Sequence, residues 1–476
     1  MKFPNPKIIS KKLNNKRINA SVDFLLKHRN SLANYKNIED FVLRDEEFTT
    51  TTNVDPKILQ GCEHHFLQVR NAILRELRIR NFYLGASVLD EVFFQILTNS
   101  NTNDPIKKTL EVIRDSGVLR PGFVLYPVHS FGVIGGGLIS SFTPIEIDFF
   151  IPELGLIVTP QTNSYETSIK FIKRGMYYLD IKKKLKTDLI EHWIRSRPLK
   201  WLKRNPLLIV RMHNFPGEYY ENQLFIVNKL RTAIVALMML NSIQDFISSK
   251  EGFLFSSTRT NNWETFDIKH YLVFYPKPHT KELTGDCVPM NFTQFTLSEL
   301  SELPIEIDPK FWRYKTKLKV EIIQTVISIE KGFYQYSFGA KKENNKSRVY
   351  RKFFRSFEFF RRSFRRTDDI GEQIVNLAVA FEILLTDFYT PGTVNKILNR
   401  LSKLLKGVKG VRKLKKSVND LFEMRGQYVH SGFVDKSQFS MEVARTAYVY
   451  TSIKLNLKMA NLSYNTETPI KYMIEG

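Results

Sequence analysis

The sequence predicts an α+β protein in which a mixed α/β N-terminal region is followed by an all-α helical bundle. Three observations support this prediction. Apolar residues recur at steps of three and four before about residue 115, alternate between residues 122 and 160, and return to steps of three and four after residue 345. At 476 residues the chain can build more than one core. We therefore expect an α+β sensor or recognition region over residues 21–340 and the bundle over residues 346–476.

The first twenty residues are the exception to this periodicity. They carry six basic side chains among Asn and Pro, namely Lys2, Lys7, Lys11, Lys12, Lys16 and Arg17. Chain ends of this composition are often poorly ordered. We predict a flexible basic arm over residues 1–20.

The α+β region alternates between the two periods. Helices are expected over residues 56–114, 165–203, 218–249 and 311–338, and strands near residues 123–126, 145–151, 155–158, 207–212, 253–257 and 271–275. Residues 277–309 are rich in turn formers, and the polar segment 341–347 has no apolar period. We place the main domain boundary in that last segment.

The expected bundle begins with an aromatic stripe. Tyr350, Phe353, Phe357, Phe360 and Phe364 are separated by steps of 3, 4, 3 and 4, so they share one helix face and are expected in the core. Further helices are expected from Asp368, over residues 393–406 and 411–430, and from residue 438 to about 462.

The composition limits the function. A net charge of +23 and a pI near 9.7 favour binding to a polyanion, and nucleic acid is the expected partner. Cys62 and Cys287 are the only cysteines, which excludes a disulfide framework and a cysteine-rich zinc site. No signal peptide core occurs in the first thirty residues, and the longest apolar run, residues 233–240, is too short to span a bilayer. We expect a cytoplasmic protein with no membrane partner, no metal and no cofactor.

The candidate site is an arginine and a histidine near the C-terminus. Arg425 and His430 are separated by four residues and are followed by Ser431 and Gly432. An arginine can neutralise a phosphodiester while a histidine moves its protons, and this suffices to cut RNA without a metal. Positions five apart in a helix diverge by roughly 140°, so the two side chains share a face only if the helix ends at or between them. Gly432 is the expected end.

The final 120 residues resemble the HEPN superfamily, and most closely its Apea-like branch. The resemblance rests on Asp368–Leu385, which contains Ala-Phe-Glu-Ile-Leu-Leu, and on Leu421–Gly432 with the Arg-His pair. It implies a bundle that pairs two-fold, so that two such pairs face one cleft and cut RNA through attack of the ribose 2'-hydroxyl. His430 would move the proton, Arg425 would neutralise the phosphorane, and Glu382, at the family's acidic position, would orient Arg425.

The same resemblance implies a cellular role. The sequence also differs from the family at one position of the motif. Such architectures occur in bacterial antiphage proteins of the abortive infection type, which implies that the N-terminal region senses a phage protein or nucleic acid. The residue after the arginine is often polar in active members, whereas this chain has Gly426.

A basic run leads to the motif and is the expected RNA-binding surface. The run consists of Lys403, Lys406, Lys409, Arg412, Lys413, Lys415 and Lys416. Two arginines from the first bundle helix, Arg362 and Arg366, are expected to belong to the same surface.

Two alternatives remain open at this point. The bundle could be catalytically inactive, serving to dimerise the chain and to bind nucleic acid. The strands around Asp148 also resemble, faintly, the hairpin of restriction-like nucleases. There Thr159-Pro160-Gln161 replaces the expected Glu-x-Lys, so this region would be a degenerate nuclease domain centred on Asp148.

Overall fold

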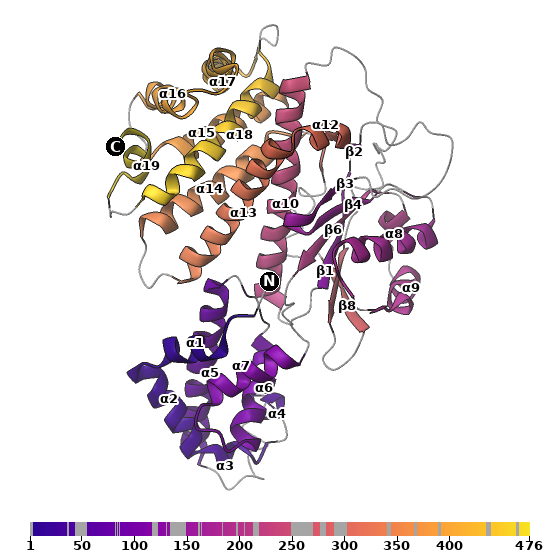
Figure 1. The fold of residues 1–476 in the computed structure, drawn as a ribbon, viewed down its shortest axis with the longest axis vertical. Helices are drawn as coiled ribbons and strands as arrows, with labels where there is room; N and C mark the ends of the chain where they lie inside the picture. The colour runs from indigo at the N-terminus through magenta and orange to yellow at the C-terminus, as the bar shows by residue number, and fades with distance from the viewer. Residues whose placement is uncertain are drawn as a thin grey trace.

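The computed structural model describes most of the chain. The described residues are 3–35, 38–42, 55–80, 82, 84, 86–116, 122–129, 131–133, 149–159, 162, 164–182, 184–196, 199–203, 205–212, 219–248, 270–276, 282–289, 302–339, 344–365, 369–388, 392–434, 439–462 and 466–476. They form a group of N-terminal helices, a curled sheet with helices on both faces, and a C-terminal helical bundle (Figure 1).

The N-terminal helices have a core of their own. They are α1 (Pro6–Leu13), α2 (Lys16–Lys27), α3 (Arg29–Leu32), α4 (Ile38–Val42), α5 (Pro56–Ile79), α6 (Ala86–Asn99) and α7 (Pro105–Asp115). Their apolar faces, among them Leu25, Val69 and Phe93, are buried against one another. Helix α5 also contacts α13 of the bundle.

The prediction of a flexible arm over residues 1–20 was wrong. The asparagines that suggested disorder cap helices: the side chain of Asn5 accepts a hydrogen bond from the amide of Lys7, and that of Asn15 accepts one from the amide of Ile18. Ile9 is fully buried in the N-terminal core. The basic side chains of Lys7, Lys11, Lys12, Lys16 and Arg17 therefore project from two packed helices.

The main sheet has the strand order β3-β4-β6-β1-β7-β8-β5. The strands are β1 (Gly122–Pro127), β3 (Phe149–Ile151), β4 (Leu156–Thr159), β5 (Lys184–Leu185), β6 (Leu207–Met212), β7 (His270–Pro276) and β8 (Glu282–Pro289). Neighbouring strands are antiparallel except for β5 and β8, which are parallel. A small parallel pair joins β2 (Gly132–Val133) to β9 (Glu306–Ile307).

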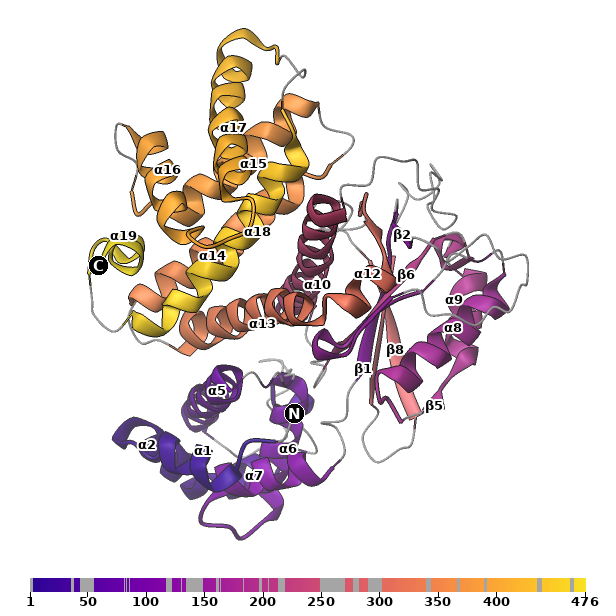
Figure 2. The same ribbon diagram turned by 45° about the horizontal axis from the view of Figure 1, so that its top comes forward.

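The sheet is buried on both faces. Along β1, Phe123 and Leu125 point toward α8 (Tyr165–Tyr178), α9 (Thr187–Ser196) and the 3-10 turn η3 (Lys200–Lys203). Val124 and Tyr126 alternate with them and pack toward α10 (Tyr219–Ser248). Figure 2 shows α8 and α9 on the outer side of the sheet, away from the bundle. The fold class is therefore α+β, as predicted.

The bundle contains the helices expected after residue 345, the helical segment expected at 311–338 in the α+β region, and a C-terminal helix that was not predicted. It comprises α12 (Pro309–Tyr314), α13 (Thr316–Gly339), α14 (Asn345–Arg362), α15 (Ile370–Leu385), α16 (Thr393–Leu404), α17 (Val411–Ser431), α18 (Met441–Lys458), the turn η5 (Met459–Asn461) and α19 (Pro469–Glu475). All five aromatic residues of the stripe are buried, four in α14 and Phe364 just after its end, which confirms that the stripe is core.

The apolar core continues across the polar segment 341–347. Phe333 of α13 stacks on Phe354 of α14 with ring centroids 4.1 Å apart. Helix α10 packs against α18, and the side-chain hydroxyl of Thr446 donates to the carbonyl of Ser242 over 2.7 Å. Helices α10 and α13, which the sequence assigned to the α+β region, thus share the core of the bundle.

Helix α10 is also the most apolar long helix described. Its segment Val227–Ser248 has a mean hydropathy of 1.3, and it is the one helix in the described ranges long and apolar enough to cross a membrane. However, 78% of its most apolar window is buried in the fold. The segment is the central helix between the sheet and the bundle.

Candidate functional site

The Arg-His motif lies in the last two turns of α17. The helix begins after Gly410 and ends at Gly432, both of which adopt left-handed backbone angles with φ of 78° and 70°. The amide of Gly432 donates to the carbonyl of Tyr428 over 2.9 Å. The predicted helix end is confirmed, but it falls after His430, so Arg425 and His430 belong to one continuous helix.

Arg425 is paired with Glu382 of α15. Its Nη1 lies 3.2 Å from Glu382 Oε1, and the two side chains remain 36% and 26% exposed. Burial raises the pKa of the Glu382 carboxyl, and the guanidinium of Arg425 partly opposes this rise. Arg425 Nε is buried and has no hydrogen-bond partner among the described residues. The guanidinium is therefore held beside Glu382, and its other N–H groups make no hydrogen bond to a described residue.

His430 is exposed and lies in the last turn of α17. Within the described part of the chain its ring makes no hydrogen bond or ion pair. The neighbouring side chains of Val429 and Phe433 are 61% and 71% exposed. A solvent-facing imidazole thus sits between two exposed apolar side chains.

The structure does not bring Arg425 and His430 together within one chain. The buried residues of α17, including Leu414, Val418 and Leu421, lie on the same side of the helix as Arg425. His430 is rotated by roughly 140° from Arg425, toward solvent. A site that uses both groups on one phosphate needs a second copy of α17.

Sequence reasoning missed Tyr428, which fixes the end of α17 on α15. A Cβ atom added to Gly371 would lie 2.1 Å from the Tyr428 ring, so the ring packs directly on the backbone of α15. The Tyr428 hydroxyl is 3.4 Å from Glu372 Oε1. Arg425 and Tyr428 are three residues apart and therefore share a face, which is the signal that could have revealed this contact.

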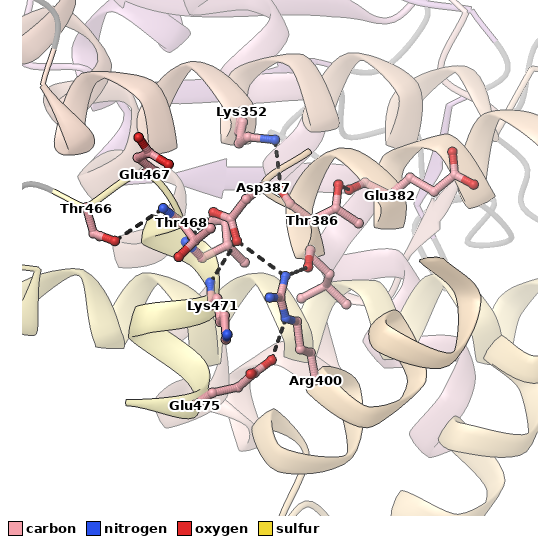
Figure 3. A network of polar contacts seen from close by, with 12 residues as sticks. Lys352, Glu382, Thr386, Asp387, Arg400, Thr466, Glu467, Thr468, Lys471 and Glu475 are labelled. Atoms are coloured by element: carbon pink, nitrogen blue, oxygen red, sulfur yellow. Dashed lines mark hydrogen bonds and ion pairs between the residues drawn. The ribbon is translucent and has the colours of Figure 1, made fainter. Parts of the chain in front are cut away.

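The end of α15 that carries Glu382 is anchored by a buried polar network (Figure 3). Arg400 of α16 is 3.5 Å from Asp387 and 2.7 Å from Glu475 of α19, and its Nη1 donates to the carbonyl of Leu385. Lys352 of α14 donates to the carbonyl of Thr386 over 2.9 Å. The Glu382 carboxylate points away from this network, toward α17.

The expected RNA-binding residues of α16 and α17 form an exposed basic surface. All seven are exposed, and none makes an ion pair with a residue in the described ranges: Lys403, Lys406, Lys409, Arg412, Lys413, Lys415 and Lys416. Arg362 differs, because it pairs with Glu358 over 2.9 Å on α14. Arg366 lies outside the described residues.

Most of the alternative site lies outside the described residues. This applies to Asp148, Pro160 and Gln161. Thr159 is described and buried, and its hydroxyl accepts a hydrogen bond from the amide of Leu207 over 3.2 Å. The residue in place of the expected acid is therefore used to join β4 to β6. Over the described ranges no three His, Cys, Asp or Glu side chains gather in a group that could hold a metal ion.

Comparisons with known proteins leave the family of this chain open. Neither the protein-family models, nor the curated proteins, nor the solved structures contain a significant match to it.

Proposed function

We propose that this protein is a metal-independent endoribonuclease whose site is formed by Arg425 and His430 in a HEPN-like bundle. The observation that carries the proposal is the ion pair between Arg425 and Glu382, which positions a guanidinium with an uncommitted donor two turns from the end of α17. His430 follows in the last turn and is open to solvent.

The chemistry requires two proton transfers and one charge stabiliser. The ribose 2'-hydroxyl loses its proton to an imidazole and attacks the adjacent phosphorus, while the bond from phosphorus to the 5'-oxygen breaks. The 5'-oxygen takes up a proton from the imidazolium that has just formed, so one His430 acts first as base and then as acid, and the products are a cyclic phosphate and a free 5'-hydroxyl. Arg425 stabilises the additional negative charge that develops on the phosphoryl oxygens.

Pairing of two chains accounts for the divergence of Arg425 and His430. A two-fold axis close to the end of α17 would place His430 of one protomer opposite Arg425 of the other. The exposed side chains of Val429 and Phe433 offer apolar surface for this contact. The proposed active form is therefore a homodimer through the C-terminal bundle.

The basic surface of α16 and α17 supports RNA as the substrate. Seven uncompensated cations precede the motif along the chain, and each phosphate that they neutralise releases a counterion and adds affinity. We place the activity in the cytoplasm, in antiphage defence of the abortive infection type, with the N-terminal region responding to a phage protein or nucleic acid.

The direct test is cleavage of total RNA by the purified protein in excess EDTA. We expect cleavage that persists in the chelator and falls by at least about 100-fold in His430→Ala. His192→Ala, which removes an equally exposed histidine from α9, serves as the control and should cut normally. RNA cutting that requires magnesium, or an unchanged His430→Ala, would refute the proposal.

A second candidate is a bundle that dimerises and binds RNA without cutting it. The 140° divergence within one helix favours it, because no single chain presents both groups to one phosphate. It predicts retained RNA affinity with no cleavage by the wild-type protein. The nuclease centred on Asp148 is the third, and it predicts magnesium-dependent DNA cutting that is lost in Asp148→Ala.

A further inference from the structure

The outer face of α8 combines exposed tyrosines with uncompensated cations. Lys170, Lys173, Arg174 and Tyr177 follow the i, i+3, i+4, i+7 spacing, so they share one face of the helix. The buried residues of α8, such as Ile172 and Met176, lie on the opposite face against the sheet. We call this outer face the α8 platform.

The tyrosines of the α8 platform present open ring surface. Tyr177 is 81% exposed and Tyr178 is 43% exposed, and their rings meet edge to face with centroids 5.7 Å apart. Phe150 and Arg174 hold Tyr178 from two sides, each about 5.9 Å from its ring centroid. The faces of the Tyr177 ring are thus left available at the end of a short aromatic cluster.

The charge of the α8 platform is unbalanced. Glu166 is the only carboxylate in α8, against Lys170, Lys173 and Arg174. None of these three cations makes an ion pair with any residue that the structure describes. A solvated helix face usually alternates charges, whereas three cations and one carboxylate, Glu166, stand on this one.

The α8 platform is also rigid. A Cβ atom on Gly175 would lie 2.6 Å from Ile209 Cδ1 of β6, so α8 sits directly on the sheet. The helix ends at Tyr178, so Tyr177 and Tyr178 lie in its last turn, and Asp180 follows with a left-handed φ of 55°. A helix that is already fixed on the sheet loses little backbone entropy on binding.

We propose that the α8 platform binds single-stranded nucleic acid, with bases stacking on Tyr177 and phosphates contacting Lys170, Lys173 and Arg174. Aromatic rings beside uncompensated cations are the combination that single strands require, because every base has a stacking face and every linkage carries a charge. In both views α8 lies on the side of the sheet away from α17 (Figures 1 and 2), so this surface is separate from the Arg425 region. It gives the α+β region a nucleic-acid ligand of its own.

The test measures binding without cleavage. The probe is a fluorescein-labelled 2'-O-methyl oligouridylate of about 12 nucleotides, which lacks the attacking hydroxyl, so its binding is independent of whether the bundle is a nuclease. Fluorescence anisotropy is measured with the full chain carrying Lys413→Gln, Lys415→Gln and Lys416→Gln, which weakens the competing surface on α17. Oligothymidylate of the same length and double-stranded RNA are the second and third probes.

Tyr177→Ala is expected to weaken binding of the single-stranded probes by roughly 5- to 100-fold, and Tyr177→Phe should bind like the parent. Lys170→Gln with Lys173→Gln should lower the slope of log affinity against log salt by about 1.4. Tyr314→Ala removes a tyrosine that is 88% exposed on α12 and should have no effect. The relative affinities for the two single strands decide between RNA and DNA.

Equal binding by Tyr177→Ala and the parent chain would overturn the proposal. So would a preference for the double-stranded probe, because a duplex hides the base faces. Binding to phosphatidylserine vesicles is measured last. The proposal would also fail if the protein bound these vesicles in a Tyr177-dependent manner but bound no oligonucleotide, because the α8 platform would then be a membrane-binding surface. Circular dichroism of each variant verifies folding.

Discussion

Arg425 of α17 and Glu382 of α15 form an ion pair across the bundle, with 3.2 Å between Nη1 and Oε1. Arg425 and Glu382 are more than forty residues apart in sequence, yet their side chains meet in space. If the pair orients the guanidinium for catalysis, Glu382→Gln should reduce cleavage by about 10-fold, because a neutral amide holds the guanidinium less firmly. The free energy of unfolding should change by less than about 1 kcal/mol, since both side chains are partly exposed.

Initial rates of cleavage of a fluorescent RNA, together with urea unfolding, separate these effects. Glu423→Gln, an exposed carboxylate two residues before Arg425, is the matched control and should leave both quantities unchanged. A Glu382→Gln protein that cuts at the wild-type rate would show that the ion pair is only structural.

A mixture of two inactive variants tests whether each site takes groups from two chains. Arg425→Ala and His430→Ala are expected to be inactive alone. Unfolding and refolding them together should restore about a quarter of wild-type cleavage, because half of the randomly formed dimers are mixed and each mixed dimer holds one intact site out of two. Cleavage of fluorescent RNA is the measurement. A mixture that stays inactive, although size exclusion shows dimers, would exclude a shared site.

The sequence predicted the bundle better than the rest of the fold, and the reason is local periodicity. The bounds of α17 were nearly correct because Gly410 and Gly432 adopt left-handed angles that few other residues tolerate. Helix α1 was missed because Ile9 becomes buried only through contacts with distant helices. The core shared by α10, α13 and the bundle depends on long-range packing, which no local pattern encodes.

The candidate site was predictable in its residues but not in its geometry. The contact between Glu382 and Arg425 came from a resemblance and is present in the structure. The role of Tyr428 was missed: its spacing from Arg425 places both on one helix face, but its partner Gly371 has no side chain to mark the contact. Neither the sequence nor a single chain reveals how His430 would meet Arg425.

The close approach of Tyr428 to Gly371 predicts a steric effect. Gly371→Ala would place a methyl group 2.1 Å from the Tyr428 ring, so either the ring or α17 must move. We expect a loss of about 1–3 kcal/mol in the free energy of unfolding and reduced RNA cleavage, measured by urea unfolding and by initial rate. In the double variant with Tyr428→Ala, the two stability losses should be clearly less than additive.

Gly426→Ala is the matched control for this substitution. Gly426 lies inside α17, the helix that carries Tyr428, and nothing comes within 4 Å of a Cβ atom added to it. Alanine should therefore stabilise the protein by up to about 1 kcal/mol, because glycine is a poor helix former. Equal stability changes at Gly371 and Gly426 would argue against the steric account.

Arg400 is predicted to be essential for stability. Its side chain is 8% exposed and pairs with Asp387 and Glu475 while donating to the Leu385 carbonyl. Arg400→Met leaves Asp387, 4% exposed, without its charged partner, so we expect a loss of about 3–5 kcal/mol in urea unfolding. Lys403→Met, on the exposed side of the same helix, should change stability by less than about 0.5 kcal/mol. Similar losses for both variants would contradict a special role for the network.

Asp245 of α10 gives the protein a specific pH dependence. It lines a cavity of about 230 Å³ between α10 and α18. Burial is the main cause that raises the pKa of this carboxyl to about 7, and Glu442 and Glu306 add to the rise. The side-chain amide of Asn241, which donates to Asp245 over 2.9 Å, and the guanidinium of Arg445 oppose it. The protonated carboxyl is therefore the form that the fold favours.

The sign of the effect follows from this raised pKa. The contribution of protonated Asp245 to stability is fully present below the ordinary pKa near 4 and is lost as the pH rises through about 7. Asp245→Asn, which cannot ionise, should unfold in urea like the wild type at low pH and be more stable above pH 7, by at most about 4 kcal/mol. Glu191→Gln removes an exposed carboxylate from α9 and should show no such divergence. Parallel stability curves for Asp245→Asn and the wild type across this range would mean that folding does not raise the pKa of the Asp245 carboxyl.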